Sequence, residues 1–298
     1  MQKIAITMGE PEGIGSEIIL KALQDFDCKN FILIGNKKVF EKTEKICSLK
    51  LPEIEFINIE GSSNGEIAYL CLKKACDLAN EGKIKGIATA PLSKFSLKEA
   101  GYNYSGQTEI LSKELSDNDE AQMLFCAKNL KILLLTRHLP IKEVPKAITQ
   151  EKIIKTIRIL DKELKEKFNI KNPKIAICAL NPHAGENGML GTEEIEVFLP
   201  SITKLRQEGI DITNPISADF LLGKAVSNFR NPEYDAYVAA YHDQALPCIK
   251  SLGMGEVLNV TIGLKVLRVS PSHGTACDIA YKNCASYESM HNTIQYLL

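Results

Sequence analysis

Three of the five histidines in this 298-residue chain occupy the same kind of position along the sequence. His138, His183 and His242 each come shortly after a run rich in Ile, Leu, Val or Ala. Open α/β sheets bind ligands beyond the carboxyl ends of their strands, so three imidazoles at that edge would converge. Neutral imidazole binds divalent transition metals, and three protein ligands leave a coordination position for substrate. We therefore expect a metal site, although any one of these histidines alone is more commonly a loop or core residue.

A second set of side chains could bind a small anion. Arginine binds a phosphate or carboxylate through two parallel hydrogen bonds, and lysine and amide groups add further donors. The alternative for each cation is an ordinary surface charge. The expected contacts are Gln107 and Thr108 in the segment Y-S-G-Q-T-E, followed by Lys250, Asn259 and Arg268 along a glycine-containing stretch.

Two glycine-rich segments could lie against a cofactor. Residues 272–280, S-H-G-T-A-C-D-I-A, cluster His, Thr and Asp around a glycine that allows close approach of the backbone. Residues 9–17, G-E-P-E-G-I-G-S-E, resemble a phosphate-binding turn but match neither a Walker A loop nor G-x-G-x-x-G. For this second segment a tight structural turn is at least as well supported.

The elements that must position these residues alternate between short apolar runs and amphipathic stretches. Residues 151–168 carry apolar side chains at helical spacing, with Lys and Glu on the other face, which predicts a helix. Residues 192–208 predict a second helix, capped by Thr192, kinked at Pro200 and ended by Gly209. Such alternation is typical of an α/β fold with a largely parallel sheet. We expect strands at residues 3–8, 31–34, 85–88, 131–135, 174–180 and 235–241.

The composition argues against several classes of protein. The 36 basic and 37 acidic residues give a formal net charge of −1, whereas a nucleic-acid binder usually carries a basic excess. No apolar run reaches the roughly 20 residues that cross a bilayer, and the first residues lack the pattern of a secretory signal. Nine cysteines without a C-x-x-C pair indicate reduced thiols. We therefore expect a cytoplasmic protein that binds neither nucleic acid nor a membrane.

Eight short segments, spread over nearly the whole chain, make the sequence resemble the family of 4-hydroxythreonine-4-phosphate dehydrogenases. They keep the order of the family and are specific together, although several would be weak alone. The segments are I-T-M-G-E-P-E-G-I-G at Ile6, T-A-P-L-S-K at Thr89, G-Q-T-E at Gly106, H-L-P at His138, L-N-P-H-A-G-E at Leu180, Y-H-D-Q-A-L-P at Tyr241, N-V-T-I-G-L at Asn259 and H-G-T-A at His273.

The resemblance implies a fold and an assembly. The fold would be two interleaved α/β/α domains of the isocitrate/isopropylmalate dehydrogenase type, with a cleft between them that holds the active site. Residues 1–108 and 262–298 would form the discontinuous domain on the cofactor side. Residues 109–261 would form the domain with the metal, substrate and dimer contacts. The family also implies an obligate homodimer in which both subunits contribute to each site.

The resemblance further implies roles for individual residues. Asp219, in the segment S-A-D, is expected near the substrate. The general base stays open between Asp219, Lys250 and a metal-bound water. The metal ligands fall on His138, His183 and His242, the substrate contacts on Gln107, Thr108, Lys250, Asn259 and Arg268, and the expected cofactor contacts on Gly274, Thr275 and Asp278.

The implied reaction is the oxidation of 4-phosphonooxy-L-threonine at its secondary alcohol. It would use NAD, with NADP as the alternative, and one divalent metal per site, such as zinc, cobalt or magnesium. Loss of carbon dioxide would then give 3-amino-2-oxopropyl phosphate, in pyridoxal 5′-phosphate biosynthesis. Two alternatives stay open: a related dehydrogenase for four-carbon sugar-acid 4-phosphates, and an inactive paralogue that binds a metabolite.

Four features depart from the usual pattern of the family. Gln107 stands where histidine is usual, so a hydrogen bond to substrate is kept but an acid–base role is lost. Ser272 replaces a usual aspartate, and Phe220 replaces a usual threonine. Residues 281–287 lack the usual glycines. None of these changes removes an expected metal ligand.

Overall fold

The computed structural model describes residues 2–116, 121–253 and 255–298. The chain forms two compact units. The first contains Met1–Ala121 and Met254–Leu298, and the second contains Gln122–Gly253. The first unit is therefore discontinuous in sequence, and the second is inserted into it. The described residues 109–116 and 255–261, which we expected in the second domain, lie in the first unit.

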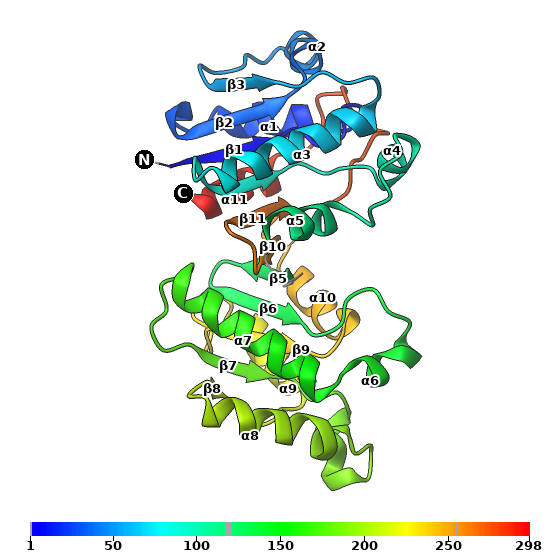
Figure 1. The fold of residues 1–298 in the computed structure, drawn as a ribbon, viewed down its shortest axis with the longest axis vertical. Coiled ribbons are helices and arrows are strands. Elements are labelled where there is room, and N and C mark those ends of the chain that lie inside the picture. Colours follow the sequence, from blue (N-terminus) through cyan, green and yellow to red (C-terminus); the bar gives the residue numbers. More distant parts are fainter. Residues whose placement is uncertain (1, 117–120, 254) are drawn as a thin grey trace. The chain divides into compact units, whose positions relative to one another are not determined.

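The sheet of the first unit has the order β3 (Glu55–Asn58), β2 (Phe31–Gly35), β1 (Lys3–Thr7), β4 (Ile84–Thr89), β11 (Leu267–Pro271) and β10 (Leu258–Ile262) (Figure 1). Neighbouring strands from β3 to β11 are parallel. β10 is antiparallel to β11, with Asn259 opposite Ser270 and Thr261 opposite Arg268. This pairing places β10 in the first unit.

The helices of the first unit are α1 (Gly15–Leu23), α2 (Lys37–Cys47), α3 (Asn64–Asn80), α4 (Lys94–Glu99), α5 (Gln107–Leu115) and α11 (Glu288–Leu297). Asn36, Ser63 and Ser93 cap α2, α3 and α4, because their side chains accept hydrogen bonds from backbone N–H groups of the first turn. α3 lies on one face of the sheet, whereas α1 and α11 pack together on the other (Figure 1).

The sheet of the second unit has the order β5 (Gln122–Ala127), β6 (Leu130–Leu134), β9 (Ala236–Ala239), β7 (Lys174–Ile177) and β8 (Asp211–Ile212). β5 and β6 are antiparallel, and the pairs from β6 to β8 are parallel. The carboxyl ends of β6, β9 and β7 therefore lie at one edge of this sheet. The three histidines singled out above follow these three strands.

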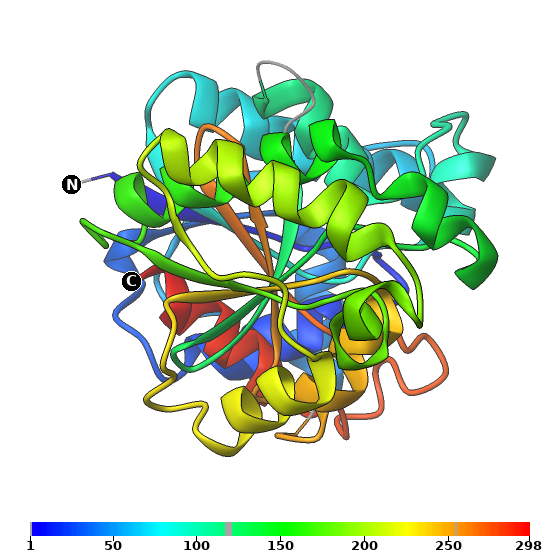
Figure 2. The same ribbon diagram turned by 90° about the horizontal axis from the view of Figure 1, so that it is seen from below.

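Helices cover both faces of this second sheet. They are α6 (Val144–Ala147), α7 (Gln150–Glu166), α8 (Leu199–Gln207), α9 (Ala218–Ser227) and α10 (His242–Lys250). Figure 2 shows α7 and α8 on one side of the strands and α9 and α10 on the other, and each pair is in contact. This layering confirms the α/β class expected from the sequence.

The six expected strands are confirmed, and α7 confirms the expected helix at residues 151–168. The expected helix at 192–208 differs, because it begins with a π-helical turn, Glu194–Phe198, before α8. Thr192 does not cap it, since the residue at the N-cap position is Glu193, which makes no capping hydrogen bond through its side chain. Pro200 lies in the first turn of α8, where a missing N–H costs no helical hydrogen bond.

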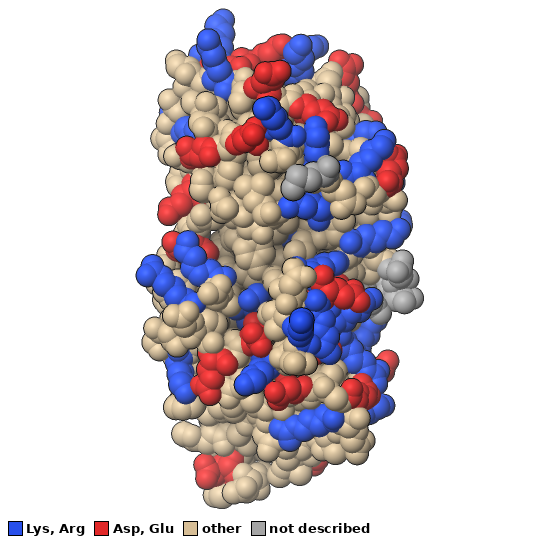
Figure 3. All heavy atoms as spheres, turned by 90° about the vertical axis from the view of Figure 1, so that its left-hand side faces the viewer, with Lys and Arg blue, Asp and Glu red and all other residues tan. Residues whose placement is uncertain are grey.

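Figure 3 shows both signs of charge on the face that it presents, as the near-zero net charge predicts. All nine cysteines fall within the described residues and are free thiols. Within residues 2–116, 121–253 and 255–298, no helix is both long and apolar enough to span a membrane.

Candidate functional site

Two of the expected metal ligands lie side by side in the second unit. His138 follows β6, and His242 is the first residue of α10, directly after β9. β6 and β9 are neighbouring parallel strands, so their ends deliver both side chains to one edge. The two imidazole ring centres are 5.5 Å apart, and the rings are tilted by 47°.

Asp243 orients one of these imidazoles. Its Oδ1 lies 2.6 Å from Nδ1 of His242, and Asp243 is itself exposed. This contact fixes the ring and leaves Nε2 as the atom that could bind a metal. Sequence reasoning missed Asp243, although its position next to His242 was the available signal.

The third histidine lies in an unusual backbone segment. Residues Pro182–Gly188 follow β7, and His183 begins a run of six residues with positive φ. His183 also lies near Asp219, at the first turn of α9. The Ser217 hydroxyl holds the pKa of Asp219 below its usual range, with smaller contributions from the Phe220 backbone N–H and from His183.

The donor set fits a divalent transition metal only in part within one chain. Two adjacent imidazoles, one of them oriented by a carboxylate, have suitable chemistry. In the described part of the chain, however, no three His, Cys, Asp or Glu side chains are grouped closely enough to hold a metal. The structure therefore brings His138 and His242 together and leaves His183 outside a three-residue group.

Arg268, on β11 of the first unit, is a buried cation with neutral neighbours. Its side chain is only 4% exposed, and burial lowers its pKa to about 10. Nε donates to Oγ1 of Thr89 at 2.9 Å, and Nη1 donates to Oγ1 of Thr261 at 3.3 Å. Nη2 donates to Oε1 of Gln107 at 3.1 Å. Among the residues that the structure describes, no carboxylate pairs with this guanidinium.

An unpaired buried cation is costly, so its place next to polar, uncharged side chains is typical of a site for an anionic ligand. Sequence reasoning identified Arg268 and Gln107 but missed Thr89 and Thr261. Thr89 ends β4, and Thr261 faces Arg268 across the β10–β11 pair. That pairing, which the sequence did not reveal, is the reason they were missed.

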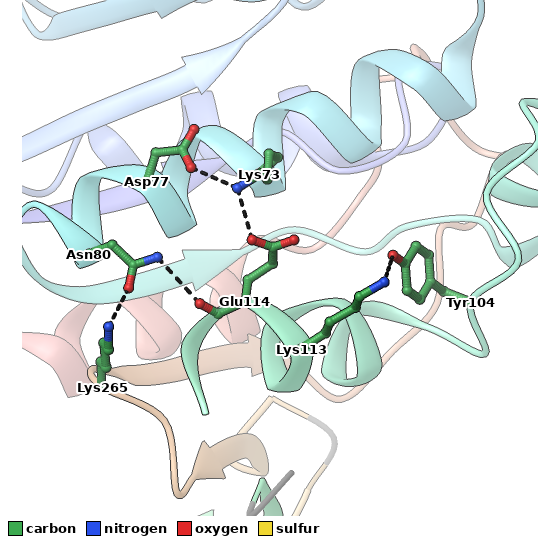
Figure 4. Close-up of polar contacts among 7 residues, drawn as sticks. All are labelled: Lys73, Asp77, Asn80, Tyr104, Lys113, Glu114 and Lys265. Carbon is green, nitrogen blue, oxygen red and sulfur yellow. Dashed lines mark hydrogen bonds and ion pairs between the residues drawn. The ribbon is translucent and has the colours of Figure 1, made fainter. Parts of the chain in front are cut away.

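Gln107 and Thr108 are the first two residues of α5 and are half-buried. Nε2 of Gln107 donates to the backbone oxygen of Ala90 at 2.9 Å, so its amide spans Ala90 and Arg268. Figure 4 shows how the other end of α5 is held against α3. The contacts run from Lys73 to Asp77 and Glu114, from Asn80 to the Glu114 backbone oxygen, and from Lys265 to Asn80.

Two further expected substrate contacts have polar atoms without protein partners. Asn259 lies opposite Ser270, two residues along from the Thr261–Arg268 pair, so Asn259 and Arg268 share one face of the strand pair. The Oδ1 atom of Asn259 is buried without a hydrogen-bond partner among the described residues. Lys250, the half-buried last residue of α10, makes no side-chain hydrogen bond or ion pair with the part of the chain that is described.

The expected cofactor segment follows β11 and is largely open. Gly274 is exposed and a side chain added there would meet nothing within 4 Å. Thr275 is half-buried and Asp278 is exposed. The neighbouring His273 contacts the Gly274 backbone oxygen through Nδ1 at 3.0 Å, whereas its buried Nε2 has no partner in the described residues.

The glycine-rich turn at residues 9–17 is a structural turn. The N–H of Glu10 donates to Pro91, that of Gly13 to Glu10 and that of Ile14 to Thr275, in each case to the backbone oxygen. These N–H groups are therefore not available to a phosphate. Glu10 itself is almost fully buried, and this burial raises the pKa of its carboxyl group.

Known proteins similar to this chain share nearly its whole length. The model of the family described as pyridoxal phosphate biosynthetic protein PdxA matches residues 14–297. A 4-hydroxythreonine-4-phosphate dehydrogenase of Sulfurihydrogenibium sp. (strain YO3AOP1) is 40% identical over 99% of this chain and 97% of the relative. A "Putative D-threonate 4-phosphate dehydrogenase" of Oceanobacillus iheyensis is 37% identical over 96% of this chain and 94% of the relative.

Solved structures of known proteins are also similar to this chain over nearly its whole length. A crystal structure of 4-hydroxythreonine-4-phosphate dehydrogenase from Klebsiella pneumoniae has a TM-score of 0.89 at 31% identity, and the match covers 100% of this chain and 98% of that one. A β-decarboxylating dehydrogenase of Thermococcus kodakarensis has a TM-score of 0.57 at 16% identity, and the match covers 100% of this chain and 83% of that one. This second likeness concerns the fold alone, and it confirms the fold class expected from the sequence.

Proposed function

The chain belongs to the family of pyridoxal phosphate biosynthetic proteins PdxA, and from this premise we propose that it is a 4-hydroxythreonine-4-phosphate dehydrogenase. The reaction is the NAD-dependent oxidation of 4-phosphonooxy-L-threonine at its secondary alcohol. Decarboxylation of the resulting β-keto acid gives 3-amino-2-oxopropyl phosphate. This places the enzyme in pyridoxal phosphate biosynthesis, and its free cysteines support a cytoplasmic location.

The observation that carries this proposal is the environment of Arg268. The substrate has a phosphate and a carboxylate, and an anionic group bound at Arg268 supplies the counter-charge that its neutral neighbours do not. Thr108, Lys250 and Asn259 have side-chain atoms without protein partners in the described residues, so they can orient the rest of the substrate.

The metal site of the proposal consists of His138, His183 and His242. The adjacent rings of His138 and His242 and the carboxylate of Asp243 support it. A bound divalent ion, such as zinc, cobalt or magnesium, supplies Lewis acidity to the alcohol and to the negative charge that develops during decarboxylation. Because the described residues of one chain do not group three ligands, we propose that a second subunit supplies at least one imidazole.

Exposed apolar side chains support a homodimer with shared sites. Ile141 is 66% exposed, Met189 is 83% exposed and Phe220 is 64% exposed. Each lies within six residues of His138, His183 or Asp219. Large apolar side chains that remain exposed next to functional residues are typical of a surface that a partner covers. A second copy of this chain is the partner that would cover them and complete the metal site.

The oxidation requires one proton acceptor and one hydride acceptor. Asp219 or Lys250 would take the proton of the hydroxyl group, and NAD, when bound, would accept the hydride from the carbon that bears this hydroxyl. The carbon–carboxylate bond then breaks, and its electron pair moves into the neighbouring carbonyl group. The lowered pKa of Asp219 keeps it ionised near neutral pH, but it also makes this carboxylate a weak base.

Gly274, Thr275 and Asp278 form the proposed cofactor contacts. The open space at Gly274 allows close approach of a ligand. The exposed carboxylate of Asp278 can accept hydrogen bonds from ribose hydroxyls and would repel an additional phosphate. This charge favours NAD over NADP.

A second candidate substrate is a four-carbon sugar-acid 4-phosphate, such as D-threonate 4-phosphate. The relative from Oceanobacillus iheyensis carries that name. Both polar atoms of Gln107 are engaged by Arg268 and Ala90, so this amide does not select the substrate amine over a hydroxyl. Gln107 therefore gives no reason to exclude the sugar-acid phosphate as the substrate.

Side-by-side turnover tests the proposal. Protein stripped of metal is supplied with zinc, cobalt or magnesium, NAD and either substrate, and the formation of NADH is followed by absorbance. We expect NADH with 4-phosphonooxy-L-threonine only when a metal is present. Faster turnover of the sugar acid would favour the second substrate, and an unchanged rate after metal removal would contradict the metal site.

A further inference from the structure

The turn that carries His183 has a backbone that ordinary residues rarely adopt. From His183 to Asn187 the φ angles are 51°, 54°, 77°, 44° and 54°. Four of these five residues have a side chain, and for such residues the left-handed conformation is normally visited singly and not in a row. A conformation of this kind persists only where the surrounding structure holds it, and such places cluster at functional sites.

Glu194, at the start of the following π-helical turn, binds the two residues that precede this segment. Its Oε1 accepts hydrogen bonds from the backbone N–H groups of Leu180 at 2.8 Å and Asn181 at 2.9 Å. Its Oε2 accepts a third, at 2.9 Å, from Nδ2 of Asn181. The carboxylate is 3% exposed. Leu180 and Asn181 directly precede the Pro182–Gly188 turn, so these bonds fix where the turn begins.

Two glycines leave room for this arrangement. A Cβ at Gly185 would lie 2.8 Å from Oε2 of Glu194, and a Cβ at Gly191 would lie 2.4 Å from Nδ2 of Asn181. Both glycines also have positive φ. Any side chain at either position would push against the Glu194–Asn181 contact. The turn and the buried carboxylate therefore pack together only because both positions are glycine.

We propose that Glu194 is a positioning residue that sets the direction of the His183 imidazole toward the metal. Glu194 acts through the backbone of Leu180 and Asn181 and makes no contact of its own with the metal. The inference rests on the proposed function, because it takes His183 as a metal ligand. It adds a residue that metal binding requires although it lies outside the ligand set.

Glu194→Ala removes all three hydrogen bonds, and Glu194→Gln keeps an oxygen that can accept from the two N–H groups. Gln places an amide nitrogen opposite Nδ2 of Asn181, so it restores the arrangement only in part. Glu196→Ala is the matched control, because Glu196 is exposed and lies in the same turn. This control removes the same charge without touching Leu180 or Asn181.

Two measurements on the full-length protein test the proposal at a temperature where every variant is folded. The affinity for Co²⁺ is measured by titration, and hydrogen exchange is measured over residues 180–191. We expect Glu194→Ala to weaken Co²⁺ binding by roughly 10- to 100-fold and to lose protection in this segment. For both the Co²⁺ affinity and the protection, we expect Glu194→Gln to give values between those of Glu194→Ala and the wild type. Glu196→Ala should match the wild type in both.

Each other outcome overturns a defined part of the account. Wild-type Co²⁺ affinity in Glu194→Ala, with protection lost, would show a structural role only and would overturn the positioning role. Unchanged protection would overturn the role of the hydrogen bonds themselves. If His183→Ala binds Co²⁺ as tightly as the wild type, the proposed metal site fails, and the inference fails with it. If Glu194→Ala does not fold, the comparison of Glu194→Gln with Glu196→Ala decides.

Discussion

At the scale of single residues, the informative feature is that a buried cation and a buried amide oxygen lack the partners that a purely structural role would give them. Arg268 is surrounded by hydroxyl and amide oxygens, and Asn259 has a buried oxygen without a partner in the described residues. A structural arginine at 4% exposure normally pairs with a carboxylate. These two residues are therefore better explained by a ligand than by the fold.

The residue scale gives a stability prediction for Arg268→Met. Removing a buried cation that lacks a counter-charge should leave the ligand-free protein as stable as the wild type or more stable. Inorganic phosphate at about 100 times its Kd should stabilise the wild type by about 2.7 kcal/mol and should not stabilise the variant. Thermal unfolding with and without phosphate measures both effects. A large loss of stability in the ligand-free variant would instead assign Arg268 a structural role.

A second prediction at this scale concerns Asp243. The change Asp243→Asn keeps the shape of the side chain but removes the charge that orients the His242 ring. We expect the affinity for Zn²⁺ to fall by roughly 10- to 100-fold without a change in secondary structure. Competition with a chromophoric chelator measures the affinity. Equal affinity in the variant and the wild type would show that Asp243 does not support a metal ligand.

At the scale of elements, the site depends on how α5 and the ends of the strands are held. Lys73 on α3 contacts Asp77 and Glu114, and these two carboxylates raise the pKa of the lysine. These partly exposed ion pairs are individually weak. Asn80 donates a hydrogen bond to the backbone oxygen of Glu114 and accepts one from the Lys265 ammonium at the same end of α5 (Figure 4). Together they fix the helix whose first residues are Gln107 and Thr108.

We therefore predict a small effect for Lys73→Met. The free energy of unfolding should fall by about 0.5–1 kcal/mol, measured by urea denaturation. Turnover at 25 °C should stay within about 3-fold of the wild type because Asn80 and Lys265 still hold α5. Lys83→Met, which removes the exposed contact with Glu81, is the control and should change neither quantity. A loss of activity beyond 10-fold would mean that the ion pairs of Lys73, and not the contacts of Asn80 and Lys265, position Gln107.

The elements also show where sequence reasoning reached its limit. Apolar runs predicted β6, β7 and β9, and hence the histidines that follow them. β10 and β11 were not predicted, because Asn259, Thr261 and Arg268 interrupt the apolar pattern with polar side chains that face each other across the strand pair. The left-handed turn at His183 was also beyond prediction, since the residues that precede it are held by Glu194, which lies outside the turn.

At the scale of the whole molecule, each unit carries a separate part of the expected chemistry. The second unit contains the histidines with Asp219 and Lys250, and the first contains Arg268, Gln107 and the cofactor segment. Family membership covers both units, since the match extends over residues 14–297. In the described part of one chain, no group of three metal-binding side chains is complete, which is why the proposal includes a second subunit.

Mixing two inactive variants tests whether subunits share a site. His183→Ala and His242→Ala should each be inactive alone. After unfolding and refolding together, mixed dimers contain one site with all of its ligands if these histidines come from different subunits. Activity should then recover to about a quarter of the wild-type value for random pairing in a two-fold dimer. No recovery, with mixed dimers verified by mass spectrometry, would place both histidines in the same subunit's site.

The central claim is that one enzyme oxidises and decarboxylates a phosphorylated hydroxy-amino acid. It is tested most directly with 4-phosphonooxy-L-threonine that carries deuterium on the carbon bearing the secondary alcohol. In the presence of NAD and a divalent metal, we predict that the deuterium appears in the reduced cofactor and that one carbon dioxide is released per cofactor reduced. Reduced cofactor without deuterium, or oxidation without release of carbon dioxide, would contradict the account.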